Sequence, residues 1–157
     1  MRIALPLAII LAIAAPASAK PDARATVRAL FGAMEQAFRK ADEAAFKKTW
    51  HPAGYEENLV GGSGIPGKSV FRQGSRKGWF LKPDLDKLRT LDASKGVHVV
   101  YCPVWSWKQE RAVDAVHALL VTTKGALQML GGGEHEAEVL ALGERYLKDQ
   151  PLAPPKK

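Results

Sequence analysis

The order of two hydrophobic periodicities constrains the fold of this chain more than any other feature of its sequence. Residues 22–50 place apolar side chains at three- and four-residue steps, the spacing of an amphipathic helix. Residues 97–123 are instead rich in β-branched and aromatic residues and predict long strands. Helices followed by neighbouring strands predict an α+β fold, in which an N-terminal helix pair packs on one face of a curved antiparallel sheet.

The N-terminal helical segment is expected to bend into two helices. Asp22 and Asp42 are the expected N-caps, because a carboxylate can accept hydrogen bonds from the free amides of a first turn. The second helix carries Trp50 and is expected to end before Pro52. Glycines and prolines then crowd residues 51–67, which predicts loops and turns framing at most a short edge strand.

The rest of the chain predicts a run of strands and a closing helix. Short strand-like runs come first, and the two longest, 97–107 and 111–123, are separated by a Lys-Gln-Glu hairpin connection. The strand-like runs outside this hairpin are residues 69–73, 78–82, 87–91 and 126–130. After three glycines, helical spacing returns over residues 134–149, which predicts an extra C-terminal helix. The Pro- and Lys-rich tail, residues 150–157, is expected to be disordered.

The first 19 residues have the pattern of an export signal. Arg2 precedes an apolar run that is too short for a comfortable membrane span, and Ala17-Ser18-Ala19 offers a small-x-small cleavage site. We expect a Sec-type signal peptide over residues 1–19, with an uncleaved anchor as the alternative, followed by a single domain over residues 20–149. The protein is then secreted and periplasmic, and no later segment is apolar enough to be transmembrane.

One cysteine and one glycine-rich motif bear on the chemistry of the chain. Cys102 is the single cysteine, so an internal disulfide is excluded and a buried, inert thiol is expected. Residues 62–69 match the phosphate-loop pattern G-x-x-x-x-G-K-[ST]. That mechanism needs a strand before the loop and a helix beginning at Lys-Ser, but Gly74, Gly78 and Pro83 interrupt the following residues. We therefore interpret the motif as a hairpin turn, and we expect no nucleotide or other cofactor.

Two segments carry a resemblance to a known family. Residues 29–52, ALFGAMEQAFRKADEAAFKKTWHP, and residues 112–133, AVDAVHALLVTTKGALQMLGGG, resemble the nuclear transport factor 2-like superfamily, which includes the SnoaL-like domains. KADEAAFKKTW is similar to the family's turn between its first two helices. Ala41 departs from the glycine that many members have there, and the C-terminal helix is an addition that many members lack.

The resemblance covers roughly residues 24–133 and implies a cone-shaped fold. In that fold the sheet wraps around the helices and encloses an apolar pocket. Members include isomerases, cyclases, dehydratases, epoxide hydrolases and non-catalytic binding or assembly domains. The resemblance therefore leaves the function open.

His117 is the candidate proton carrier. Strand alternation places it on an apolar strand face, with Asp114 pointing the other way. If that face lines the pocket, the imidazole is suited to general acid–base work, with Tyr101 or Tyr55 polarising the substrate. The alternative is a histidine whose hydrogen bonds are satisfied within the fold.

The other histidines support weaker hypotheses. His98 and Cys102 share a strand face, but four residues of strand separate them by about 13 Å, too far for a nucleophile and its base. His51 is expected to cap the C-terminus of the second helix, where a cation is favoured. His135 lies among glutamates that the start of a helix already explains, so no metal site is expected.

Aromatic residues are the main candidates for the wall of a ligand pocket. Strand alternation places Tyr101, Trp105 and Trp107 on one face with Val97 and Val99. The alternative is that these side chains simply form the core. The full candidate set, with the residues from the helices, is Trp79, Tyr101, Trp105, Trp107, Phe31 and Trp50.

Basic residues gather in the middle of the chain. Arg72, Arg76, Lys77 and Lys82 surround Trp79 in the sequence. They are interpreted either as a solvated sheet edge or as a basic surface for an anionic ligand, a lipid head group or a polyanion. Nucleic acid is not an expected partner, because an exported protein has no ordinary genomic role and no recognition motif is present.

The sequence favours a non-catalytic binding module whose apolar pocket accepts a small hydrophobic molecule or an apolar group of a protein partner. One alternative is a cofactor-free acid–base enzyme (an isomerase, dehydratase or hydrolase) that uses His117. The other is an assembly module that forms a homodimer, which predicts a broad uncovered apolar sheet face.

Overall fold

Two aspartates begin the N-terminal helices, as predicted. The computed structural model describes residues 22–156, so the predicted signal peptide lies outside the described residues. Helix α1 (Ala23–Lys40) begins where Asp22 accepts a hydrogen bond from the amide of Arg24, and α2 (Glu43–Lys48) begins where Asp42 accepts one from Ala45. Between them Ala41 takes a φ of 51°, a left-handed conformation that turns the chain sharply.

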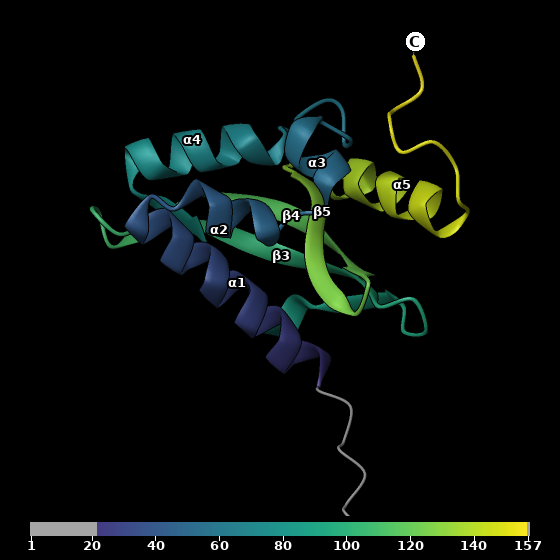
Figure 1. Ribbon diagram of the computed structural model, residues 1–157, viewed down its shortest axis with the longest axis horizontal. Coiled ribbons are helices and arrows are strands. Elements are labelled where there is room, and N and C mark those ends of the chain that lie inside the picture. The colour runs from purple at the N-terminus through teal and green to yellow at the C-terminus, as the bar shows by residue number, and fades with distance from the viewer. Residues whose placement is uncertain (1–21, 157) are drawn as a thin grey trace, which may run out of the picture.

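The strands form one antiparallel sheet that curls strongly into a half-barrel (Figure 1). Strand β3 (Val97–Ser106) pairs with β4 (Arg111–Thr123), which pairs with β5 (Ala126–Gly133). Strands β1 (Trp79–Leu81) and β2 (Arg89–Asp92) both pair with the other side of β3. The α+β class and the β3–β4 hairpin are therefore confirmed.

Three register shifts mark this sheet. They lie between Thr90 and Asp92 where β2 faces β3, between Val104 and Trp105 where β3 faces β4, and between Leu119 and Leu120 where β4 faces β5. Such shifts are typical of β-bulges, which increase the local twist and bend a strand. They account for the curl, and they also change which face a side chain occupies beyond the shift.

Apolar side chains fill both faces of the sheet. On the inner face, α1, α2 and α4 (Gly67–Lys77) bury a core that includes Met34, Phe46 and Leu120. On the outer face, α5 (Glu136–Leu147) packs against β3, β4 and β5 around Leu119, Val121 and Leu142 (Figure 1). The predicted C-terminal helix is therefore present, and it covers part of the outer face.

The segment between α2 and β1 differs from the prediction of loops followed by a strand. Pro52 begins the short helix α3 (Pro52–Glu56). Proline is favoured at a first helical position because the backbone N–H that it lacks would have no partner within the helix there. Residues 67–77, where a strand was predicted over 69–73, form α4 instead. This helix buries Phe71 and brings Gly74 against the ring of Phe38, an approach that a larger residue would block. Tertiary packing overrides the local strand preference here.

The remaining segments are short. A 3-10 turn, η1 (Leu85–Lys87), precedes β2, so this strand begins later than predicted. Beyond α5, Leu152 packs against the outer-face core, and its carbonyl accepts a hydrogen bond from Arg145. No helix in the described part of the chain combines the length and apolarity needed to cross a bilayer.

Candidate functional site

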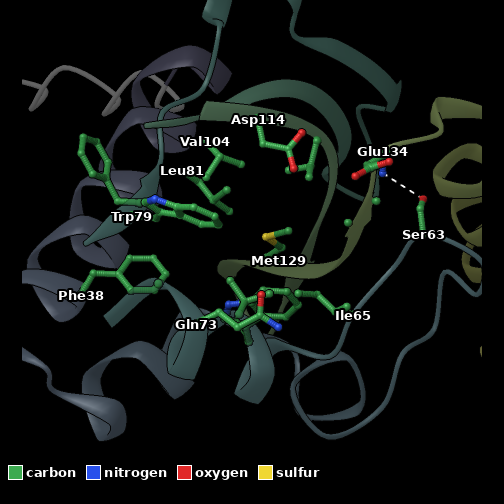
Figure 2. Close-up of a pocket in the computed structure, with 17 residues that line it drawn as sticks. Phe38, Ser63, Ile65, Gln73, Trp79, Leu81, Val104, Asp114, Met129 and Glu134 are labelled. Atoms are coloured by element: carbon green, nitrogen blue, oxygen red, sulfur yellow. Dashed lines mark hydrogen bonds between the residues drawn. The ribbon is translucent and has the colours of Figure 1, made fainter. Parts of the chain in front are cut away.

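A cavity of about 260 Å³ lies between the helices and the inner face of the sheet (Figure 2). Phe38 of α1 and Gln73 of α4 border it on the helical side, and Trp79 and Leu81 of β1 border it on the side of the sheet. The inner faces of β3, β4 and β5 complete the wall with Val104, Val116 and Met129. Ile65, in the loop before α4, lies at its edge and is 40 % exposed. The cavity is thus mainly apolar and open to solvent on one side.

One polar atom in the wall of the cavity has no hydrogen-bond partner. Trp50 lines the cavity and is 1 % exposed, yet its indole nitrogen Nε1 makes no hydrogen bond. The ring is held in place by Gly67, at which a side chain would clash with the indole. A buried N–H without an acceptor costs stability, and this nitrogen is covered by surrounding atoms and out of contact with solvent.

Two carboxylates border the same cavity. Asp114 faces Val104 across the β3–β4 pair, and its Oδ1 accepts a hydrogen bond from the amide of Ala115. Glu134 follows β5, and its amide donates a 3.0 Å hydrogen bond to Oγ of Ser63 (Figure 2). Both residues are exposed. The cavity therefore combines apolar walls with an acidic rim.

The structure divides the predicted aromatic set. Trp79 and Trp50 line the cavity, whereas Phe31 is buried in the inner core, away from the lining. Tyr101, Trp105 and Trp107 do not line the cavity either. Instead, Trp107 stacks on Phe80 with ring centroids 6.1 Å apart, and the guanidinium of Arg39 lies over both rings.

The three predicted catalytic residues occupy two other places. His117 and Tyr101 face each other in the β3–β4 register on the outer face, with ring centroids 5.4 Å apart. They line a shallow cleft with Glu136, whose Oε2 lies 4.0 Å from Nε2 of His117. Tyr55 is buried beside α2, where its hydroxyl donates a 2.7 Å hydrogen bond to Glu43. The proposed role of His117 required its strand face to line the pocket, and that condition is not met.

The alternation of side chains along β4 explains this placement. Asp114 and Val116 point into the cavity, so His117 points to the opposite face. The sequence predicted this alternation and made the role of His117 conditional on its face lining the pocket. In the structure the face of Asp114 and Val116 borders the cavity, and the end of the other face packs against α5. Sequence reasoning consequently missed four residues of the cavity wall: Asp114, Glu134, Gln73 and Met129.

His51 and His98 have side-chain hydrogen-bond partners within the fold, and Cys102 is buried in it. His51 caps the N-terminus of α3, where its Nδ1 accepts a hydrogen bond from Ala53, so the predicted C-terminal cap is wrong. Burial lowers the pKa of His51 and that of His98, whose Nδ1 lies 2.9 Å from Oγ1 of Thr90. Cys102 is fully buried, as predicted, and burial raises the pKa of its thiol. Within residues 22–156, no three His, Cys, Asp or Glu side chains cluster as metal ligands would.

Three of the four predicted basic residues lie on α4, and Lys82 directly follows β1. Arg72 and Arg76 lie on α4 and line a shallow depression with Lys68 and Glu43. Lys77 and Lys82 instead place their ammonium groups over aromatic rings, 4.3 Å from Trp79 and 4.6 Å from Trp105 respectively. Cation–π contacts of this kind cover the apolar faces of the two indoles.

The phosphate-loop motif has a structural explanation. A helix does begin at Gly67, so the predicted hairpin turn is wrong, but α3 and coil precede the loop instead of a strand. The carboxylate of Glu138 on α5 occupies the glycine turn. Its Oε2 accepts hydrogen bonds from the amide and the hydroxyl of Ser63, at 3.3 Å and 3.2 Å. A side chain on Gly62 would collide with that carboxylate. The loop therefore binds a side-chain carboxylate of the same chain.

The apolar sheet face that an assembly module would need is not present in the described part of the chain. Ile65 is the one large apolar side chain exposed among these residues, and it lies at the edge of the cavity.

Comparison with known proteins adds no further assignment: no family model matches the chain, and neither does any curated protein or solved structure.

Proposed function

We propose that this protein is a binding module of the nuclear transport factor 2-like kind, whose cavity between the helices and the curled sheet accepts a small hydrophobic molecule. The observation that carries the proposal is the open cavity, whose walls are mainly apolar. Small-molecule sites are typically concave and mostly apolar, with few polar groups that fix orientation.

The size of the cavity sets the size of the ligand. An apolar cavity of about 150 Å³ accommodates benzene in another protein, so about 260 Å³ suits one ring with a short substituent. Transfer of the apolar surface of such a molecule from water contributes about 25 cal/mol per Å². The export predicted from residues 1–19 is part of the proposal and places this binding outside the cytoplasm.

Benzyl alcohol is a suitable first ligand for a test by NMR titration of the isotope-labelled protein. We expect saturable shifts in the signals of residues that line the cavity, including the indole ring of Trp50. A protein whose amide and indole signals do not respond to benzyl alcohol would contradict the proposal.

A matched pair of variants locates the binding. Val116→Phe places a ring in the cavity and should weaken binding at least tenfold. Val113→Phe makes the same change at a half-buried valine of β4 that does not line the cavity, and should leave binding unchanged. Equal affinity of the two variants would show that the ligand binds elsewhere.

A further inference from the structure

The charge at the cavity is opposite to the charge of the chain. The full sequence carries a formal net charge of +7, with 23 Lys and Arg against 16 Asp and Glu. Nevertheless both charged residues that line the cavity, Asp114 and Glu134, are acidic. A hydrophobic ligand without charge does not require such a rim.

Neither carboxylate is neutralised by the fold. In residues 22–156, no Lys, Arg or His makes an ion pair with Asp114 or Glu134. By contrast, Glu35, Glu56, Glu136 and Glu144 all have cationic partners. The two rim carboxylates are therefore free to attract a cation from solution.

The setting of these carboxylates strengthens that attraction. They border walls formed by Val104, Val116 and Met129, and a charge beside apolar, weakly polarisable walls is screened less than one surrounded by water.

We propose that the cavity selects organic cations, specifically small molecules with an apolar body inside the cavity and an ammonium group at the Asp114–Glu134 rim. This inference rests on the proposed function above and narrows its ligand class. The apolar walls supply affinity for the body, and the two carboxylates discriminate by charge.

Three ligands of nearly equal shape test the inference: benzylamine, benzyl alcohol and benzoate, which are cationic, neutral and anionic near pH 7. We expect benzylamine to bind three- to tenfold more tightly than benzyl alcohol, the range expected for contacts with two partly exposed carboxylates. Benzoate should bind more weakly than the alcohol. The advantage of the amine should decrease when sodium chloride is raised, because salt screens exposed charges.

Variants of Asp114 and Glu134 test whether these two carboxylates cause the preference for benzylamine. Asp114→Asn combined with Glu134→Gln should bring the affinity for benzylamine down to that for benzyl alcohol, with no change for the alcohol. Asp149→Asn removes an exposed carboxylate beyond α5 and is the matched control, because asparagine tolerates the positive φ of 53° found there. This control should retain the full preference for the amine.

The outcomes separate the two proposals. If none of the three ligands binds, the proposed function fails. If benzyl alcohol binds as tightly as benzylamine, the inference is overturned while the binding function remains. A preference for the amine that survives in the double variant also overturns the inference, because the selecting charge then lies outside the rim.

Discussion

Glu138 of α5 and Ser63 of the glycine-rich loop are joined by two hydrogen bonds, from the amide and the hydroxyl of Ser63 to the same carboxylate oxygen. The residues are 75 positions apart in the sequence. This contact fastens the outer-face helix to the loop that leads into α4 and to the edge of the cavity.

Glu138→Ala should destabilise the protein by about 2 kcal/mol, because hydrogen bonds to a charged acceptor are lost while the loop amide stays partly buried. Urea unfolding followed by circular dichroism measures the change. Glu144→Ala on the same helix removes an exposed carboxylate and is the control, with little change expected. Equal stability of the two variants would mean that the loop contact contributes nothing.

Two helical glycines should respond to alanine in opposite directions. At Gly32 of α1 a new methyl group meets no atom within 4 Å, so Gly32→Ala should stabilise the protein by about 0.5–1 kcal/mol through helix propensity. At Gly74 of α4 the methyl group would press on the ring of Phe38, so Gly74→Ala should destabilise it by about 1–3 kcal/mol. Thermal unfolding of both variants checks the signs. Stabilisation by Gly74→Ala would contradict the close packing of α4 on α1.

Tyr55 makes the stability depend on alkaline pH. Burial and the hydrogen bond to Glu43 raise the pKa of Tyr55 to about 12, whereas an unfolded tyrosine titrates near pH 10. Between these values the unfolded chain has lost the proton that the folded protein keeps, so the free energy of unfolding falls as pH rises from about 10 to about 12. Tyr55→Phe should flatten this fall at a cost of about 1 kcal/mol at neutral pH. Urea titrations at several alkaline pH values measure the slope, and an unchanged slope would refute the assignment.

His51 makes the stability depend on pH in the acidic range. Burial lowers its pKa, and its neutral Nδ1 accepts the capping hydrogen bond of α3. Below about pH 6.5 the unfolded chain therefore binds a proton that the folded protein resists, and the free energy of unfolding falls as the pH decreases. His51→Asn keeps a capping acceptor and should weaken this dependence. Unfolding midpoints at pH 7.5 and 5 compare the two proteins. His98 contributes in the same direction, so some acid sensitivity should remain in the variant.

Cys102 should be unreactive in the native protein. Its side chain is fully buried, and burial raises the pKa of the thiol, which suppresses the reactive thiolate. We expect a thiol-modifying disulfide reagent to react only at the rate at which the protein unfolds, and rapidly in denaturant. Fast stoichiometric labelling under native conditions would show that β3 opens locally.

Sequence patterns that depend on neighbouring residues predicted much of the architecture. Helical periodicity and the caps Asp22 and Asp42 located α1 and α2, and the Lys-Gln-Glu turn located the β3–β4 hairpin. The segment from Gly67 to Lys77 was mistaken for a strand and turn, because its glycines oppose a helix locally. Contacts with Phe38 and Trp50, distant in the sequence, reverse that preference.

The sequence by itself determined the α+β order, the alternation of Asp114 and His117 on opposite faces of one strand, and the burial of Cys102. Only the tertiary structure decided which face of that strand borders the cavity, because the answer depends on where the helices and α5 pack, and apolar residues occupy both faces. Trp105 and Trp107 likewise pack against the inner core, whereas Val97 and Val99, which simple alternation placed on the same face, belong to the outer-face core. Periodicity is a local property, whereas the choice of an inner face is made by contacts between distant segments.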